Sequence, residues 1–169
     1  MLGYLSAYDP YLTAKELDHP FVEAATFADD IKYGSGNWQS EQHYVDTPFL
    51  DQGGSMEDFT SAFNEYNITE TINSIVQWIS AADDGDQVYS SSYVYTYLMA
   101  LYPTNENLAK SYALRLMIHY MGDVHQPLHC EDRFNAANPA GDLGGNTFTL
   151  PNHYSADNLH SVWDKLIYT

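Results

Sequence analysis

The sequence has few basic side chains. Lys and Arg together number 6 against 23 Asp and Glu, which gives a formal net charge of −17 at pH 7. Proteins that follow a phosphate backbone usually bind it with Lys and Arg, so this composition excludes a broad basic surface for nucleic acid. Any phosphate ligand would have to be attracted locally, for example by bound metal ions, and acidic pH would help by protonating surface carboxylates.

Cysteine is also scarce, and no long hydrophobic run is present. Cys130 is the only cysteine, so an intrachain disulfide is impossible. No stretch is apolar enough for a transmembrane helix, and the first residues lack the basic start, apolar core and cleavage site of a secretory signal. With 44% hydrophobic content, 169 residues are enough to bury a core, and we expect one domain over 1–169.

Apolar residues recur at helical spacing along most of the chain, and loops rich in Gly, Asp, Asn and Ser separate these stretches. The predicted helices span roughly residues 12–31, 56–81, 104–125 and 155–168. Residues 89–98 are ambiguous because their Tyr and Val residues also favour strands, and we interpret them as helical since no turn signal follows. We therefore expect an all-α helical bundle in which ligands on several elements converge at one cleft.

Two histidine–aspartate pairs have the spacing of metal ligands on helices. His119 and Asp123 are four residues apart, as are His160 and Asp164, so each pair projects from one helix face and can bind one cation. Around the first pair, residues 113–121 are apolar on nearly every other side, which predicts a buried helix. A His and an ionised Asp are costly to bury in such surroundings unless a partner or a metal compensates them.

These pairs belong to a set of five motifs. They are Phe-Ala-Asp-Asp at 27–30, Gln-His-Tyr-Val-Asp at 42–46, Gly-Asp-Val-His-Gln-Pro-Leu-His at 122–129, Asp-Leu-Gly-Gly-Asn at 142–146 and Asn-Leu-His-Ser-Val-Trp-Asp at 158–164. In this order they resemble the zinc-dependent single-strand nucleases of fungi and plants, of the nuclease S1 and P1 type, which share their metal site with bacterial zinc phospholipases C. The resemblance covers most of the chain and implies the helical fold of that superfamily.

The resemblance implies a set of zinc ligands. Those of a first zinc correspond to Asp29, His43, His119 and Asp123, and those of a second to His129, His160 and Asp164. In the family a third zinc shares the bridging carboxylate, here Asp123, with an N-terminal Trp and a nearby His. By alignment this chain begins inside the family's first helix and stops five residues after Asp164, so we expect two complete zinc sites and a third that is lost or weak. Asp29 and Asp123 would act in catalysis through the metals that they hold.

Four further positions match family residues that contact substrate. Lys32 stands where the family often has an Arg that neutralises the phosphoryl group, and Lys keeps the charge without the bidentate hydrogen bonding. Tyr44, Asp46 and Asn146 correspond to a pocket in which a nucleobase stacks on an aromatic ring and a carboxylate reads its edge. These residues predict a substrate with exposed, unpaired bases.

The function implied by the resemblance is a zinc-dependent endonuclease. It would hydrolyse single-stranded DNA and RNA to 5′-phosphate products and act as a 3′-nucleotidase, so its partner would be single-stranded nucleic acid or a nucleotide. No protein partner is indicated, and the family implies a secreted protein or one in a lysosome-like or vacuole-like compartment. Two alternatives remain: a zinc phospholipase C, which would need an apolar lipid-facing surface, and a non-catalytic zinc-binding fragment that lacks the third metal site.

Other residues have plainer interpretations. We interpret His19 and His153 as surface residues, His125 as structural or as a support for a neighbouring metal ligand, and Trp163 as part of the core. Tyr44 is equally compatible with an ordinary core aromatic and with base stacking.

Overall fold

The structure is a computed structural model, and it describes residues 19–53, 55, 57, 66–81, 88–153 and 156–165. The predicted helical residues 12–18, 56, 58–65, 155 and 166–168 lie outside these described residues. The chain groups into two compact units. The first comprises the residues up to His43 together with Tyr66–Asp123, and the second comprises Tyr44–Glu65 together with Val124–Thr169. The prediction of one domain over 1–169 stays a prediction.

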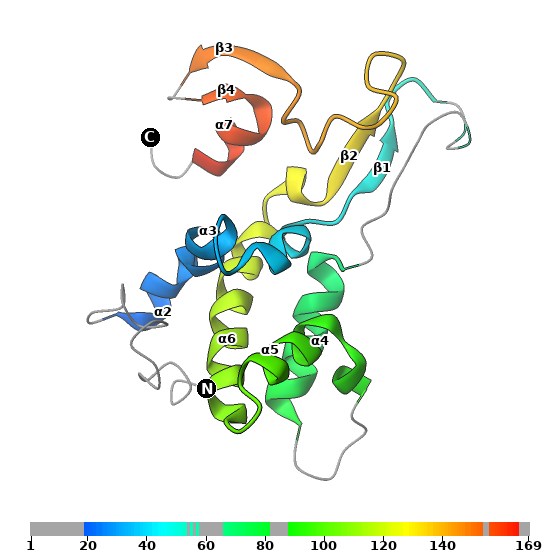
Figure 1. Ribbon diagram of the computed structural model, residues 1–169. Coiled ribbons are helices and arrows are strands. Elements are labelled where there is room, and N and C mark those ends of the chain that lie inside the picture. The colour runs from blue at the N-terminus through cyan, green and yellow to red at the C-terminus, as the bar shows by residue number, and fades with distance from the viewer. Residues whose placement is uncertain are drawn as a thin grey trace. The chain divides into compact units, whose positions relative to one another are not determined.

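Every regular secondary-structure element in the described residues of the first unit is helical (Figure 1). Its elements are α2 Pro20–Glu23, the 3₁₀ helix η1 Ala24–Thr26, α3 Phe27–Lys32, the 3₁₀ helix η2 Asn37–His43, α4 Ile68–Ser80, the 3₁₀ helix η4 Val88–Ser91, α5 Tyr93–Leu101 and α6 Glu106–Asp123. The predicted helix 104–125 is therefore present as α6, and the ambiguous residues 89–98 are helical in η4 and α5 except for Ser92, which caps α5.

Short polar side chains begin three of these helices. Asn67 Oδ1, Ser92 Oγ and Asn105 Oδ1 each accept a hydrogen bond from the backbone amide three residues later, at 3.1, 3.3 and 3.1 Å. Such N-caps satisfy one of the four backbone amides that a helix start leaves without a partner. The apolar spacing thus predicted the helices, and the capping residues determine where they begin.

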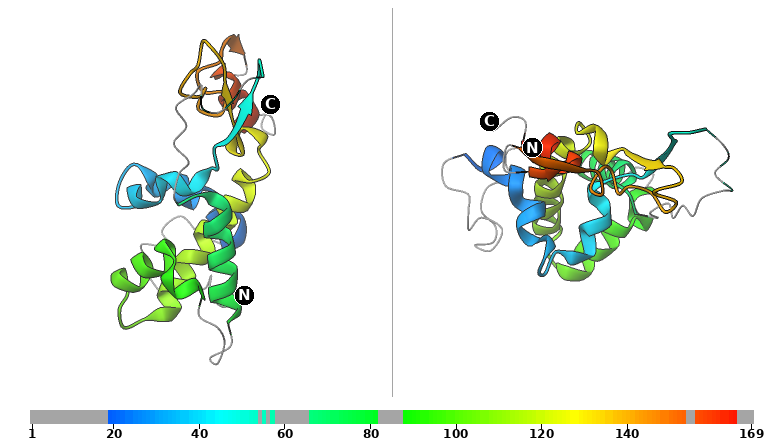
Figure 2. Two further views of the ribbon diagram at one scale, coloured as in Figure 1. Left: turned by 90° about the vertical axis from the view of Figure 1, so that its right-hand side faces the viewer. Right: turned by 90° about the horizontal axis from the view of Figure 1, so that it is seen from above.

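Helix α6 forms the centre of the first unit. It packs against α3, α4, α5 and η1, and Figures 1 and 2 show these helices gathered around it. Ten of its side chains are buried: Leu108, Ala109, Ser111, Tyr112, Ala113, Leu114, Arg115, Leu116, His119 and Tyr120. The prediction of a buried helix is confirmed, although Met121 remains 44% exposed.

The second unit contains the short strands of the structure (Figure 1). Its elements are β1 Thr47–Leu50, the 3₁₀ helix η5 Pro127–His129, β2 Glu131–Phe134, β3 Thr149–His153, β4 Ala156–Asn158 and α7 Leu159–Lys165. Strands β1 and β2 pair in parallel, with Thr47 opposite Glu131, and β3 and β4 pair antiparallel, with Thr149 opposite Asn158.

One helix prediction was wrong at its start. Residues 156–158 were predicted as part of a helix over 155–168, but they form β4 because their backbone pairs with β3. Helix α7 begins only after Asn158, whose Oδ1 accepts a hydrogen bond from the amide of Ser161 at 2.8 Å. Helices nevertheless dominate the described residues, so the all-α class is confirmed. Among those residues, every helix is too short or too polar to traverse a lipid bilayer.

Candidate metal centres

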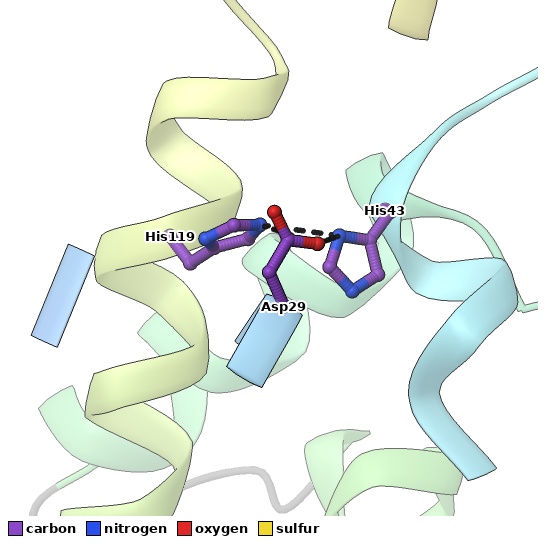
Figure 3. A group of neighbouring side chains, drawn as sticks. All are labelled: Asp29, His43 and His119. Atoms are coloured by element: carbon purple, nitrogen blue, oxygen red, sulfur yellow. Dashed lines mark hydrogen bonds and ion pairs between the residues drawn. The ribbon is translucent and has the colours of Figure 1, made fainter. Parts of the chain in front are cut away.

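The first cluster of metal-ligand side chains lies in the first unit. Asp29 projects from α3, His43 from the end of η2, and His119 from α6, and Figure 3 shows the three side chains pointing toward one another. One ligand atom of each lies within 4.8 Å of the others. The two imidazoles meet most closely, with 3.2 Å between His119 Nε2 and His43 Nδ1.

Asp123 adds a second carboxylate to this cluster. It is not one of the compact group of three, but its Oδ2 lies 2.9 Å from His43 Nδ1 and 3.1 Å from His119 Nε2. Asp29 Oδ1 is farther away, at 3.8 Å from the same two nitrogens. Ligand atoms about 2.0–2.1 Å from a tetrahedral zinc are about 3.3 Å apart, so these separations bracket the spacing of a zinc site.

A backbone carbonyl orients one of the two imidazoles. His119 Nδ1 lies 2.6 Å from the carbonyl oxygen of Ala25, which acts as acceptor, so Nε2 faces the cluster. Burial disfavours the charged form of His119, but Asp123, the Ala25 carbonyl and Asp29 outweigh burial and raise its pKa. For His43, burial is the largest effect and lowers the pKa, although Asp123 acts to raise it. The lowered pKa favours the neutral imidazole that a metal requires.

The second cluster lies in the second unit. His129 at the end of η5 and His160 and Asp164 on α7 place their ligand atoms within 4.8 Å of one another. Asp164 Oδ1 is 3.7 Å from His129 Nε2, and its Oδ2 is 3.6 Å from His160 Nε2. Gln126 Nε2 donates to Asp164 Oδ1 at 3.0 Å and so holds this carboxylate in place. Burial alone would raise the pKa of Asp164, but His129, Gln126 and His160 together lower it.

The glycine-containing loop 141–146 orients the second cluster. His160 Nδ1 donates to the carbonyl oxygen of Gly144 at 2.9 Å, which directs Nε2 toward Asp164. Gly144 has φ +59°, and a Cβ there would lie 2.1 Å from the carbonyl oxygen of Leu128. Only glycine therefore fits at this position. Any other residue would clash with the Leu128 carbonyl through its Cβ and would be strained in the left-handed conformation.

Two aspartates hold this loop in its conformation. Asp142 Oδ1 accepts hydrogen bonds from the amides of Arg133, at 3.2 Å, and Gly145, at 3.0 Å. Asp132 Oδ1 accepts from the amide of Gly144 at 3.4 Å. The carboxylates thus position the carbonyl that orients His160.

With both clusters described, the chain can be compared with known proteins. The family model described as S1/P1 Nuclease matches residues 5–169. The chain belongs to the S1/P1 nuclease family. Three relatives of this chain are Endonuclease 4 of Arabidopsis thaliana, Nuclease P1 of Penicillium citrinum and Nuclease S1 of Aspergillus oryzae.

The relatives are similar over most of this chain and less than half of their own length. Endonuclease 4 is 30% identical over 163 residues, which are 92% of this chain and 46% of that protein. Nuclease P1 is 30% identical over 141 residues, 83% of this chain and 42% of its own. Nuclease S1 is 25% identical over 144 residues, with shares of 85% and 40%. This chain therefore spans less than half the length of the curated relatives described above.

The residues expected to contact substrate have different surroundings. Lys32 Nζ lies 3.1 Å from Asp29 Oδ1, beside the first cluster. Tyr44 and Asp46 lie in the second unit and are partly buried, whereas the Asn146 side chain is exposed and donates to the carbonyl of Leu143 in its own loop at 2.9 Å. Burial, and then the charge of Asp132, raise the pKa of Asp46 to about 6.

Several residues that shape the two clusters were not predicted from the sequence. The carbonyls of Ala25 and Gly144 carry no signal in residue type, since every residue has one. Asp132 and Asp142 anchor the loop, and only the second of these belongs to a recognised motif. Trp163, interpreted as a core residue, is 42% exposed, so that interpretation was wrong.

Proposed function

We propose that this chain is a zinc-dependent phosphodiesterase that cleaves single-stranded DNA and RNA to 5′-phosphate products and has 3′-nucleotidase activity. One observation supports the proposal above the others: two separate sets of histidine and aspartate side chains, at the positions expected from the S1/P1 nuclease family, each converge within 4.8 Å. Family membership supports nuclease activity, and the convergence of the histidine and aspartate side chains supports catalysis by bound metal ions.

The donor set suits zinc. Imidazole nitrogens and carboxylate oxygens are common zinc ligands, and the first cluster offers two of each, from His43, His119, Asp29 and Asp123. The second cluster offers three protein groups, the number that leaves a position open for water or a substrate phosphate. Zinc held in such clusters would supply an activated water and bind phosphoryl oxygens.

The protein side chains would orient the substrate around these sites. The Lys32 ammonium, 30% exposed beside Asp29, would neutralise charge on a phosphate at the first cluster. Tyr44 would stack on an unpaired base, and Asp46 and Asn146 would contact its polar edge. Because the pKa of Asp46 is about 6, this carboxyl group would change from donor to acceptor between acidic and neutral pH.

The first test of the proposal is the zinc content of the full chain, purified without added metal or chelator. We expect about two zinc ions per chain, and cleavage of a single-stranded oligonucleotide that a chelator abolishes. The variants His119→Ala and His160→Ala should each bind one zinc ion fewer and lose most of the cleavage. The exposed His19→Ala is the matched control for loss of an imidazole, and it should retain both zinc content and cleavage.

The alternatives predict other outcomes of the same measurements. Hydrolysis of a phospholipid headgroup ester without oligonucleotide cleavage would identify a phospholipase C. Two zinc ions with no hydrolysis of either substrate would indicate a non-catalytic zinc-binding protein. A folded sample that binds no zinc would overturn the proposal itself. A secreted protein, or one in a lysosome-like or vacuole-like compartment, remains part of the proposal.

A further inference from the structure

A chain of buried hydrogen bonds links the three elements that supply the first cluster. Tyr120 on α6 directly follows the histidine ligand of that helix. Gln39 in η2 lies four residues before the histidine ligand at the end of η2, and Ala28 on α3 directly precedes the aspartate ligand. Each member of the chain is therefore close in sequence to a ligand that its own element provides.

The hydrogen bonds have one consistent direction. Tyr120 Oη donates to Gln39 Oε1 at 2.6 Å, and Gln39 Nε2 donates to the Ala28 carbonyl oxygen at 3.0 Å. Tyr120, Gln39 and Ala28 are all 0% exposed, so water does not compete for these groups. The Ala28 carbonyl can only accept, so the amide nitrogen of Gln39 must face α3, and its amide oxygen then faces α6 and accepts from the Tyr120 hydroxyl.

Tyr120 also contacts a ligand with its ring. The ring packs edge-on against the His43 imidazole, with 5.3 Å between centroids and an interplanar angle of 80°. The same side chain therefore fixes the place of one ligand through packing and acts on another element through its hydroxyl.

Asp29 is the ligand that most needs support from its backbone. Its side chain is 56% exposed, and its Oδ1 lies 3.8 Å from both imidazoles, whereas Asp123 Oδ2 lies within 3.1 Å of them. Packing does not hold the Asp29 carboxylate, so its position depends on where α3 is placed. The hydrogen bond from Gln39 acts at the residue just before it.

We propose that Tyr120 and Gln39 are positioning residues for the first metal site, which hold α3 so that Asp29 reaches the metal bound by the α6 and η2 histidines. The inference rests on the proposed zinc binding. Neither residue touches the metal or the substrate in this role. Their loss should therefore weaken zinc binding selectively at the first cluster.

The test measures zinc affinity of the first cluster alone. In a His160→Ala background, which disables the second cluster, zinc is titrated against a chromophoric chelator. Tyr120→Phe should weaken binding by about 10–100-fold, the usual effect of losing a residue that orients ligands. Tyr112→Phe is the matched control, because Tyr112 is a 2% exposed tyrosine on the same helix, and it should cause no comparable change.

A second variant separates positioning from stability. Gln39→Met keeps the length of the side chain and removes both hydrogen bonds, and it should weaken zinc binding as much as Tyr120→Phe does. The double variant should bind zinc no more weakly than Gln39→Met alone, since the hydroxyl acts through the amide. Its thermal unfolding midpoint without zinc should exceed that of Gln39→Met alone, because the buried Tyr120 hydroxyl that Gln39→Met deprives of its acceptor is then removed as well.

The outcomes distinguish this inference from the function on which it rests. If the unmodified first cluster binds no zinc, both are overturned. If it binds zinc and Tyr120→Phe and Gln39→Met bind it equally well, only the positioning role is overturned. Equal weakening of the second cluster, measured in a His119→Ala background, would also overturn it, because the effect would then be a general loss of structure. If Tyr120→Phe does not fold, Gln39→Met alone decides between these results.

Discussion

The two candidate metal clusters hold the same kinds of side chain in different ways. In the first, His43 and His119 are 3% and 8% exposed and come from helical elements packed around α6. In the second, His129 and His160 are 13% and 15% exposed and come from a short 3₁₀ helix and from α7. The first cluster thus depends on a packed core, and the second depends more on local loop geometry.

The clusters share one device. In each, a backbone carbonyl accepts a hydrogen bond from the Nδ1 atom of one histidine, and this leaves Nε2 for the metal. The carbonyl at the first cluster belongs to Ala25 in the helical η1, and the one at the second belongs to Gly144 in a loop with positive φ. The same orientation is therefore obtained from a helix in one unit and from a loop with left-handed glycine conformations in the other.

Removal of one histidine from each cluster separates the two regions directly, and the loss of stability should be largest at the first cluster. His119→Ala should destabilise the zinc-free protein by about 2–4 kcal/mol, because it leaves a cavity and removes the partner of the Ala25 carbonyl. His160→Ala should cost about 1 kcal/mol, because the side chain is more exposed. Urea unfolding in excess chelator measures both values. Equal losses would contradict the contrast between core and loop.

A glycine substitution should affect the second cluster more than the first. Gly144→Ala should destabilise the protein by at least about 2 kcal/mol, because the new Cβ would meet the Leu128 carbonyl and the residue has positive φ. The variant should also weaken zinc binding at the second cluster, since the displaced carbonyl no longer orients His160. Unfolding and zinc titration in a His119→Ala background measure the two effects.

The control for this change lies on α6. A Cβ at Gly122 would have no atom within 4 Å, so Gly122→Ala should stabilise the protein by about 0.5–1 kcal/mol through helix propensity. If Gly144→Ala were as well tolerated as Gly122→Ala, the loop would not determine the geometry of the second cluster.

A pH titration should distinguish the units by a smaller amount. The second unit contains the half-buried Asp46, whose pKa is about 6 against an ordinary value of 3.8. Because the folded-state pKa of Asp46 is raised, the contribution of this carboxyl group to the free energy of unfolding is fully present below pH 3.8, where the group is protonated. That contribution is lost as the pH rises through about 6, where the buried group ionises. Asp46→Asn should therefore be more stable than the unmodified chain at pH 7, by about 1 kcal/mol after allowing for its partial exposure, and equally stable near pH 3.5.

The control for the pH experiment is Asp157→Asn, which removes one exposed negative charge from the same unit. Unfolding free energies of the two variants and the unmodified chain are compared at several pH values between 3.5 and 7. A difference for Asp46→Asn that stays constant over this range would show that burial does not raise the pKa of this carboxyl group.

The sequence predicted the parts of the clusters that local geometry determines. The pairs His119–Asp123 and His160–Asp164 lie on helices as expected, because residues four apart share a helix face whatever surrounds them. The family motifs then located Asp29 and His43, which no local spacing connects to the first pair. The prediction was least successful where the backbone pairs with distant residues.

Strand β4 and the supporting contacts illustrate that limit. Residues 156–158 lie in a stretch with helical apolar spacing, and only the backbone of β3 makes them a strand. Strands β1 and β2 pair in parallel across a long separation in sequence, which no local pattern indicates. The contact between Tyr120 and Gln39 is equally nonlocal, and their residue types also suit ordinary core positions.

The smallest expected effect concerns the lysine beside the first cluster. Lys32 Nζ lies 3.1 Å from Asp29 Oδ1, a partly exposed ion pair of the kind that contributes at most about 1 kcal/mol to stability. Lys32→Gln should therefore change the unfolding free energy little. The variant should bind zinc several-fold more tightly at the first cluster, because a cation no longer competes for Asp29 or repels the metal. Repulsion between two such charges in solvent-exposed surroundings is about 1 kcal/mol. Lys110→Gln, which breaks the comparable pair with Glu106 on α6, should leave zinc affinity unchanged.

A cleavage assay of the same variant tests the role of Lys32 toward substrate. If Lys32 neutralises the phosphoryl group, Lys32→Gln should lower oligonucleotide cleavage although it binds zinc more tightly. A purely structural ion pair would not change zinc affinity and turnover in opposite directions.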